Sequence, residues 1–354
     1  MNKHLRKSLY LLLLLLPTTS PVTGQTLEMA QSQIDKLAKI ETDSLASYAD
    51  SYTYDEEYFA ENEPATIYYP KNLEGKVPAV IVVHGFNCKQ KFLQKISQHL
   101  SSHGFICITY TALDQKRPFQ WPPGLMAAYQ ILRGESMRPD SPIYGHVDFD
   151  AVALVGHSMG GAGVLHTAMM PYPNGLRGKI KTVVGLNPYN GGPLVAEMGG
   201  GANDSLGDDL SHLDIPTMIV TGSYDIVAYP WKSFAFYNSL TGPAKHAFLS
   251  IDRMDHADWY FIPSEPKYPI LRAIVYRWLR AYLADDLAYR DYFVDRPGSA
   301  FDKYLKPLLS NTPNPLTRGG EPFPPYVLSE EAPPWHYQLK VLPLQSQMSP
   351  GRTG

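Results

Sequence analysis

The sequence has little of what several classes of protein require. Two cysteines among 354 residues cannot build a disulfide scaffold or a four-cysteine zinc site. The 31 basic residues do not outnumber the 34 acidic ones, which argues against a dedicated nucleic-acid-binding protein. The metalloprotease signature H-E-x-x-H, an EF-hand loop and a Walker A loop are all missing. We therefore expect a soluble globular protein, an enzyme or a binding domain, that needs no metal or cofactor.

Long hydrophobic runs are also missing, and the first short run has the features of an export signal. Three basic residues precede the apolar run Leu9–Leu16, and small residues follow it up to Gly24. A helix that spans a bilayer needs roughly 20 apolar residues, which this run does not supply. We predict a cleaved signal peptide over residues 1–24 and a secreted or periplasmic protein with no permanent membrane span. An uncleaved membrane anchor is the alternative.

Export to an oxidising compartment leaves two interpretations of the cysteines. Cys88 lies before a predicted helix and Cys107 lies in the strand after it. A disulfide between them is conceivable. Two buried thiols are the alternative, because a side chain at strand position 107 can point away from residue 88.

Short apolar segments alternate with helical patterns over about 220 residues. Strands are expected at 65–69, 78–84, 105–111, 151–155, 182–186, 216–221 and 247–251, and helices at about 92–103, 125–132, 160–170 and 271–282. Strands that are apolar throughout are typical of a parallel sheet covered on both faces. The pattern predicts an α/β protein with a mostly parallel, twisted, doubly wound sheet and helices on both faces.

The two ends of the chain differ from this central region. Residues 25–60 are polar and are expected to form a loosely attached arm with one short helix near 29–45. The central domain is assigned to 61–286. Residues 287–354 form a proline-rich extension, and its prolines are expected to prevent helices and sheet ladders. Its aromatic residues suggest that it packs on the core.

A serine motif lies where a strand meets a helix. The apolar strand 151–155 leads directly into Gly156–Gly160, which has the pattern G-x-S-x-G, and a helical pattern follows. This is the arrangement of a nucleophile elbow, in which a sharp turn needs glycines on both sides of the serine. Ser158 is therefore the candidate nucleophile.

A serine hydroxyl needs a base to take its proton, and a carboxylate to orient that base. Asp225 follows the apolar strand 216–221, and His256 follows the strand 247–251, which is the order expected for this elbow. His212 and His246 precede their strands and are expected at the surface. The side chain of His157 is expected to pack beneath the turn.

Cleavage of an acyl bond through a tetrahedral intermediate also needs two N–H donors for its oxyanion. One is expected from the backbone of Met159, directly after the serine. The other is expected from the backbone of Phe86, because Gly85 allows a tight turn after the strand that ends at His84.

From about residue 65 to residue 283 the chain resembles an α/β-hydrolase, and within that superfamily the bacterial cutinases, polyester hydrolases and platelet-activating-factor acetylhydrolases. The matching motifs are Val82–Phe86, Gly156–Gly161, Gly222–Asp225 and Asp255–His256. The resemblance implies an esterase that forms an acyl-enzyme, with small or polymeric esters as substrates. A serine peptidase or amidase on the same fold is the alternative, and an inactive hydrolase that serves as a binding protein is a third. We expect a monomer with no nucleic-acid partner.

The resemblance also implies which side chains contact the substrate. Phe86 and Met159 would flank the acyl group, and Tyr189 occupies the position where the cutinase branch carries an aromatic ring. Polyester hydrolases commonly have tryptophan there, so the resemblance does not imply activity on plastic or cutin. Their usual carboxyl-terminal disulfide is absent.

Overall fold

The computed structural model describes residues 49–54, 59–60, 63–191, 195, 209–251, 254–259, 267–290, 293, 305–310, 326–328 and 339–341. The predicted signal peptide and the predicted helix at 29–45 lie outside these residues. Most of the proline-rich extension does too.

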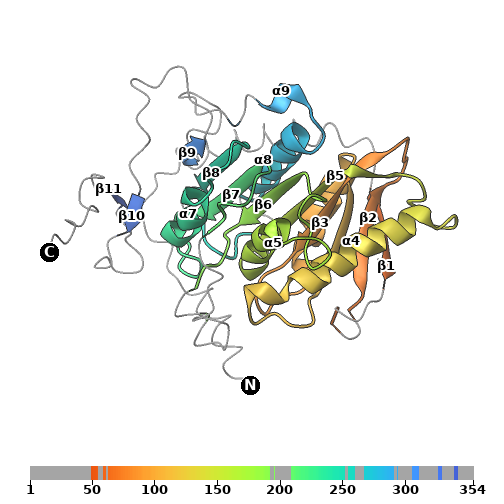
Figure 1. The fold of residues 1–354 in the computed structure, drawn as a ribbon, viewed down its shortest axis with the longest axis horizontal. Helices are drawn as coiled ribbons and strands as arrows, with labels where there is room; N and C mark the ends of the chain where they lie inside the picture. The colour runs from red at the N-terminus through yellow and green to blue at the C-terminus, as the bar shows by residue number, and fades with distance from the viewer. Residues whose placement is uncertain are drawn as a thin grey trace, which may run out of the picture.

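A nine-stranded sheet forms the centre of the protein, in the order β1-β2-β4-β3-β5-β6-β7-β8-β9 (Figure 1). Neighbouring strands from β4 to β8 are parallel, whereas β1, β2 and β9 are joined antiparallel. The strands are β1 (Ala49–Tyr54), β2 (Ala65–Pro70), β3 (Val77–Val83), β4 (Ile106–Tyr110), β5 (Val147–His157), β6 (Thr182–Leu186), β7 (Thr217–Gly222), β8 (His246–Ile251) and β9 (Leu305–Ser310). Two short strands, β10 (Tyr326–Leu328) and β11 (Leu339–Val341), form a separate antiparallel pair. The predicted mostly parallel sheet is confirmed.

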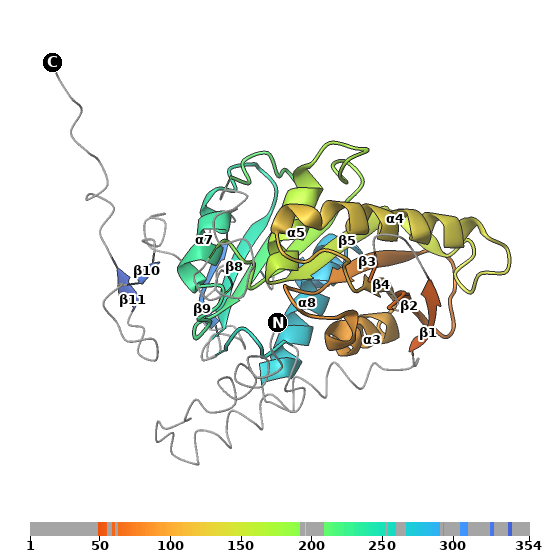
Figure 2. The same ribbon diagram turned by 90° about the horizontal axis from the view of Figure 1, so that it is seen from below.

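Helices cover both faces of this sheet (Figure 2). They are α3 (Gln94–Ser102), α4 (Pro122–Met137), α5 (Met159–Met169), α7 (Pro230–Asn238), α8 (Lys267–Tyr282) and α9 (Leu287–Arg290), with 3-10 turns η1 (Gln90–Leu93) and η2 (Pro118–Gln120). Residues of α4, α5 and α7 contribute to one hydrophobic cluster, and residues of α3 and α8 contribute to a second.

The apolar residues of strand β3 are buried on both faces of the sheet. Ala79, Ile81 and Val83 belong to the first cluster, and the alternate residues Val80 and Val82 belong to the second. Because successive side chains of a strand point to opposite faces, a strand covered on both sides has no position for a polar residue.

The two edges of the sheet differ from prediction. Residues 49–54, expected in the polar arm, form the edge strand β1, which pairs with β2. Proline density was expected to prevent sheet pairing in the extension, yet β9 pairs with β8 even though it contains Pro307. The register shifts between Phe248 and Ser250, opposite that proline. An edge strand tolerates proline because one side of it has no ladder to donate to.

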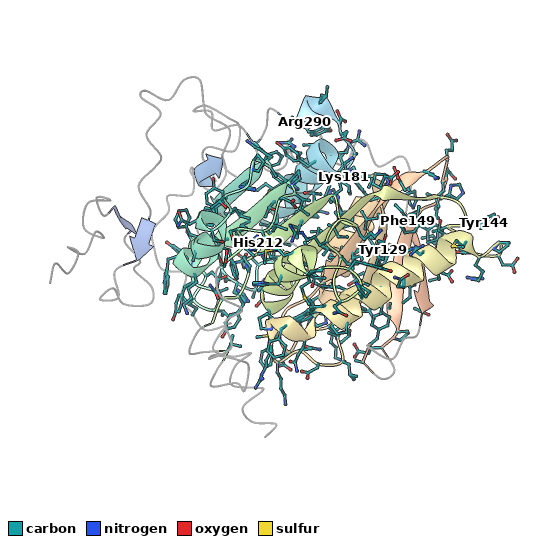
Figure 3. The ribbon with its side chains drawn as sticks, in the orientation of Figure 1. Tyr129, Tyr144, Phe149, Lys181, His212 and Arg290 are labelled. Carbon is teal, nitrogen blue, oxygen red and sulfur yellow. The ribbon has the colours of Figure 1, made fainter. Side chains whose placement is uncertain are left out.

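Several contacts tie outer elements to the sheet (Figure 3). The rings of Tyr129, on α4, and Phe149, on β5, pack edge to face with centroids 5.9 Å apart. The Asp285 carboxylate accepts hydrogen bonds from Lys181, just before β6, at 2.5 Å and from Arg290, on α9, at 3.1 Å. Within the described residues, no helix is both long and apolar enough to span a membrane.

The carboxyl ends of the parallel strands all lie on the same side of the sheet, and the loops that follow these strands lie there together. His84 follows β3, Ser158 follows β5, Asn187 follows β6, Asp225 lies beyond β7 and His256 lies beyond β8. In sheets of this kind, ligands bind outside the carboxyl ends of the strands. The fold therefore brings residues as far apart in the sequence as His84 and His256, 172 positions (256 − 84), to the carboxyl ends of the strands.

Candidate active site

Ser158 stands on a turn that only glycine neighbours permit. It lies between β5 and α5 with φ 56° and ψ −122°, a backbone conformation that residues other than glycine rarely adopt. A Cβ atom on Gly156 would lie 2.3 Å from the carbonyl oxygen of Gly160, and one on Gly160 would lie 2.2 Å from that of His84. The strand-to-helix turn predicted from the sequence is confirmed, and it places Ser158 at the amino end of α5.

His256 joins Ser158 to Asp225. Its Nε2 atom lies 2.8 Å from Ser158 Oγ, and its Nδ1 atom lies 2.7 Å from Asp225 Oδ2. A carboxylate only accepts, so Nδ1 carries the proton that it donates to Asp225, and Nε2 is left to accept from the serine hydroxyl. The structure thus brings together the three side chains predicted from the sequence.

The Asp225 carboxylate is completely buried and is held by four donors. Its Oδ1 atom accepts from the backbone N–H groups of Val227 and Ala228, each at 2.8 Å. Its Oδ2 atom accepts from His256 Nδ1 and, in a short contact, from Asn187 Nδ2. A buried charge is tolerated only where such bonds replace its hydration, so this carboxylate is fixed in orientation as well as position.

Gly85 and Met159 place two backbone groups beside the serine. A Cβ on Gly85 would be 2.6 Å from Ser158 Cβ, so this loop is in direct contact with Ser158. As the first residue of α5, Met159 has an amide N–H with no acceptor inside the helix. The amide of Phe86 follows Gly85, whose carbonyl accepts from His84 Nδ1 at 2.7 Å and from Cys88 N–H at 3.3 Å. In a trans peptide the N–H points opposite to the carbonyl, so the Phe86 N–H points away from both donors.

His84 is a buried neutral histidine that supports this loop. Its Nε2 atom accepts from the backbone N–H of Ala112 at 3.1 Å, so the proton lies on Nδ1, the atom that donates to Gly85. Burial lowers the pKa of His84 to about 4, although the bond to Gly85 opposes that shift. The ring is therefore neutral at neutral pH, and its two hydrogen bonds keep the proton on Nδ1. In the sequence, His84 marks the end of a predicted strand and lies within the motif Val82–Phe86, with no expected role of its own.

Other histidines have different places. His157 is completely buried beneath the turn, as predicted, and its Nε2 atom donates to the backbone carbonyl of His256 at 3.0 Å. His212 is exposed, also as predicted. The prediction for His246 was wrong: it is the first residue of β8 and is buried, and burial lowers its pKa to about 4.

Asn187 and Trp259 are site residues that the sequence analysis did not identify. Asn187 contacts the Asp225 carboxylate through Nδ2, and its Oδ1 atom accepts from Trp259 Nε1 at 2.6 Å. Both residues are buried. A signal was available for Asn187, because it directly follows a strand at the active edge and asparagine is one of the few residues that adopt a positive φ.

The side chains expected to touch substrate differ in exposure. Phe86 is half-buried. Met159 and Tyr189 are 0 % and 1 % exposed, so neither offers surface to a substrate as they lie. The Tyr189 ring belongs to a hydrophobic core cluster, and its backbone N–H donates to the Ser158 carbonyl at 2.9 Å.

Cys88 and Cys107 are thiols and are not joined by a disulfide. Cys107 lies level with Val80 in the middle of the sheet, whereas Cys88 belongs to the loop that begins after Val83. Three residues of strand rise by about 10 Å, and a disulfide requires Cα atoms within about 7 Å. Of the two interpretations left open, the structure supports the thiols. Among the described residues, no group of three or more histidine, cysteine, aspartate or glutamate side chains is arranged to hold a metal.

Comparison with known proteins identifies similar chains. Residues 58–306 match a family described as PET hydrolase-like. A bis(hydroxyethyl) terephthalate hydrolase of Streptomyces coelicolor is 28% identical over 247 residues, which cover 68% of this chain and 69% of that relative. A cutinase of Thermobifida alba is 28% identical over 236 residues, or 66% of this chain and 68% of that relative. A cutinase of Thermobifida fusca is 28% identical with the same two shares of coverage.

Proposed function

This chain belongs to the PET hydrolase-like family and hydrolyses carboxylic ester bonds; we propose that it does so through an acyl-enzyme formed on Ser158. The observation that carries this proposal is the hydrogen-bonded series from Ser158 Oγ through the two nitrogens of His256 to Asp225 Oδ2. A neutral imidazole in this orientation has its free nitrogen directed at the hydroxyl that must lose a proton.

In the first step Ser158 Oγ attacks the ester carbonyl carbon while His256 Nε2 takes the hydroxyl proton. The imidazolium that forms is stabilised by the buried Asp225 carboxylate. The carbonyl oxygen becomes an oxyanion, for which the N–H groups of Phe86 and Met159 are the donors; one such donor is worth roughly 3–4 kcal/mol of barrier. His256 then returns the proton to the leaving alcohol.

In the second step water replaces the alcohol. His256 Nε2 removes a proton from water as the water oxygen attacks the acyl carbon, and the proton passes to Ser158 Oγ when the acyl bond breaks. The products are a carboxylic acid and the regenerated serine. The residues involved are the same as in the first step, so one geometry serves both.

A fluorophosphonate probe tests the nucleophile directly. We expect one adduct, on Ser158, after incubation at pH 7–8, and none in Ser158→Ala. A panel of p-nitrophenyl esters of increasing acyl length, with bis(hydroxyethyl) terephthalate and a solid polyester beside it, measures the reach of the acyl pocket. Aminoacyl amides of the same acyl groups separate an esterase from the amidase alternative. Absence of any adduct in the folded wild type would favour the inactive hydrolase instead.

We also propose that the protein is exported, with residues 1–24 removed as a signal peptide and the catalytic domain over 61–286. Support comes from the basic, apolar and small-residue segments in their usual order. Mass spectrometry of the protein recovered outside the cytoplasm of an expression host should give a mature chain that begins at residue 25. A chain that retains Met1 in the membrane fraction would identify the uncleaved anchor. Sedimentation of the mature chain tests the expected monomer.

A further inference from the structure

Asn187 makes three hydrogen bonds at the point where three strands end. Its backbone N–H donates to the carbonyl of Val220 at 2.6 Å, which ties the end of β6 to β7. Its side chain reaches the Asp225 carboxylate through Nδ2 and the Trp259 indole through Oδ1. The residue is completely buried and has φ 44°, a conformation that is rare for residues other than glycine and asparagine.

The partners determine which way the amide of Asn187 faces. An indole N–H can only donate, so it must meet the amide oxygen; a carboxylate can only accept, so it must meet the amide nitrogen. An asparagine side chain is short enough to fit here and has both a donor group, for Asp225, and an acceptor, for Trp259. Leucine supplies neither, and an ionised aspartate would place an acceptor against the Asp225 carboxylate.

The Asn187 side chain links the loop that carries Asp225 to the loop that carries His256. Trp259 lies three residues after His256, and Asp225 is on the neighbouring loop. Movement of either loop therefore strains a bond to Asn187. Since Asn187 Nδ2 and His256 Nδ1 both donate to Asp225 Oδ2, rotation of the carboxylate would break both bonds together.

We propose that Asn187, oriented by Trp259, is a positioning residue that fixes the Asp225 carboxylate toward His256; this inference rests on the proposed function of that pair. Asn187 itself exchanges no proton and touches no reacting atom.

The test compares two tryptophans that each donate one indole hydrogen bond to a buried side-chain oxygen. Trp259 donates to Asn187, and Trp278 donates to Thr182 Oγ1 at 2.8 Å on the face covered by α8. We expect Trp259→Phe to lower kcat about tenfold with KM unchanged, and Asn187→Leu to lower it 100-fold or more. Trp278→Phe should lower the melting temperature and leave kcat within twofold of the wild type.

A double-mutant cycle separates positioning from general loosening. If Trp259 acts through Asn187, adding Trp259→Phe to Asn187→Leu costs no further activity. The downfield proton resonance of His256 Nδ1–H should be shifted or broadened in both single variants and unchanged in Trp278→Phe. Should Asn187→Leu not fold, Trp259→Phe and the resonance still decide the question.

Two outcomes overturn the inference: kcat within threefold of wild type in Asn187→Leu, or full additivity of the two losses. Failure of the proposed function gives a different result, because then the wild type itself neither cleaves esters nor reacts with the fluorophosphonate. In that case the resonance of the Asp225–His256 pair still reports whether Asn187 orients it.

Discussion

A Cβ atom on Gly85 would lie 2.6 Å from Cβ of Ser158 and 3.1 Å from its Oγ. The loop that offers the Phe86 amide and the turn that presents the serine are therefore in direct contact. Nothing larger than a hydrogen atom fits between them. The proposed oxyanion donor and the proposed nucleophile are positioned by the same packing contact.

Gly85→Ala should consequently damage catalysis without abolishing folding. The added methyl group must displace the loop or the serine, and a misplacement of about 1 Å can cost roughly 100-fold in rate. We expect kcat/KM to fall by about that factor. Gly134→Ala is the matched control: Gly134 is exposed in α4 with nothing within 4 Å of an added Cβ. That control should keep full activity and gain about 1 kcal/mol of stability. Unaltered kcat/KM in Gly85→Ala would contradict the tight contact.

Ser158 is expected to carry both activity and backbone strain. Ser158→Ala should lower kcat by at least about three orders of magnitude, with circular dichroism unchanged. Glycine inside a structure usually costs about 0.5–1 kcal/mol relative to alanine, but the conformation at φ 56° and ψ −122° suits glycine better. Ser158→Gly should therefore be at least as stable as Ser158→Ala in urea unfolding. A Ser158→Gly variant that is less stable by about 1 kcal/mol would show that the turn stores no strain.

The parallel sheet and the strand-to-helix turn at Ser158 could be predicted from the sequence because each depends on a local pattern. Ile81 and Val82 are apolar neighbours on opposite faces and indicate a strand covered on both sides, and the glycines around Ser158 indicate the turn. Trp259 could not be found in this way, because its role depends on Asn187, 72 positions away. The position of Asn187 directly after a strand was visible in the sequence, but its partner Asp225, 38 positions away, was not. The edge strands were missed for another reason. Pairing of β1 and β9 is decided by the neighbouring strand, not by their own polar or proline-rich composition.

The two cysteines give a test of the oxidation state. Burial raises the pKa of the Cys107 thiol to about 12, partly offset by a hydrogen bond with Ser101, so this thiol should be inert in the native protein. We expect a thiol reagent to count two groups in denaturant, and dithiothreitol to leave the melting temperature unchanged. A disulfide of this loop length would contribute about 3 kcal/mol, so a clear fall in the melting temperature under reduction would show that Cys88 and Cys107 do pair.

His99 should make the folded state sensitive to mild acid. It is buried on α3, its Nε2 atom has no hydrogen-bond partner among the described residues, and burial, with the nearby His103 and Arg272, lowers its pKa to about 2. The unfolded chain binds a proton at His99 near pH 6.5, whereas the folded protein does not. Stability contributed by the neutral ring is thus present above pH 6.5 and is lost as the pH falls below it.

Replacement by an apolar side chain removes this penalty. At pH 5, which is 1.5 units below the unfolded pKa, the penalty amounts to about 2 kcal/mol. His99→Leu should therefore gain about 2 kcal/mol relative to wild type between pH 7.5 and pH 5, measured as the difference in unfolding free energy from urea titrations at the two pH values. His212→Leu, at an exposed position, is the control and should show no such change. If the advantage of His99→Leu is the same at both pH values, His99 binds a proton equally well in the folded and unfolded states, and its pKa is not lowered by folding.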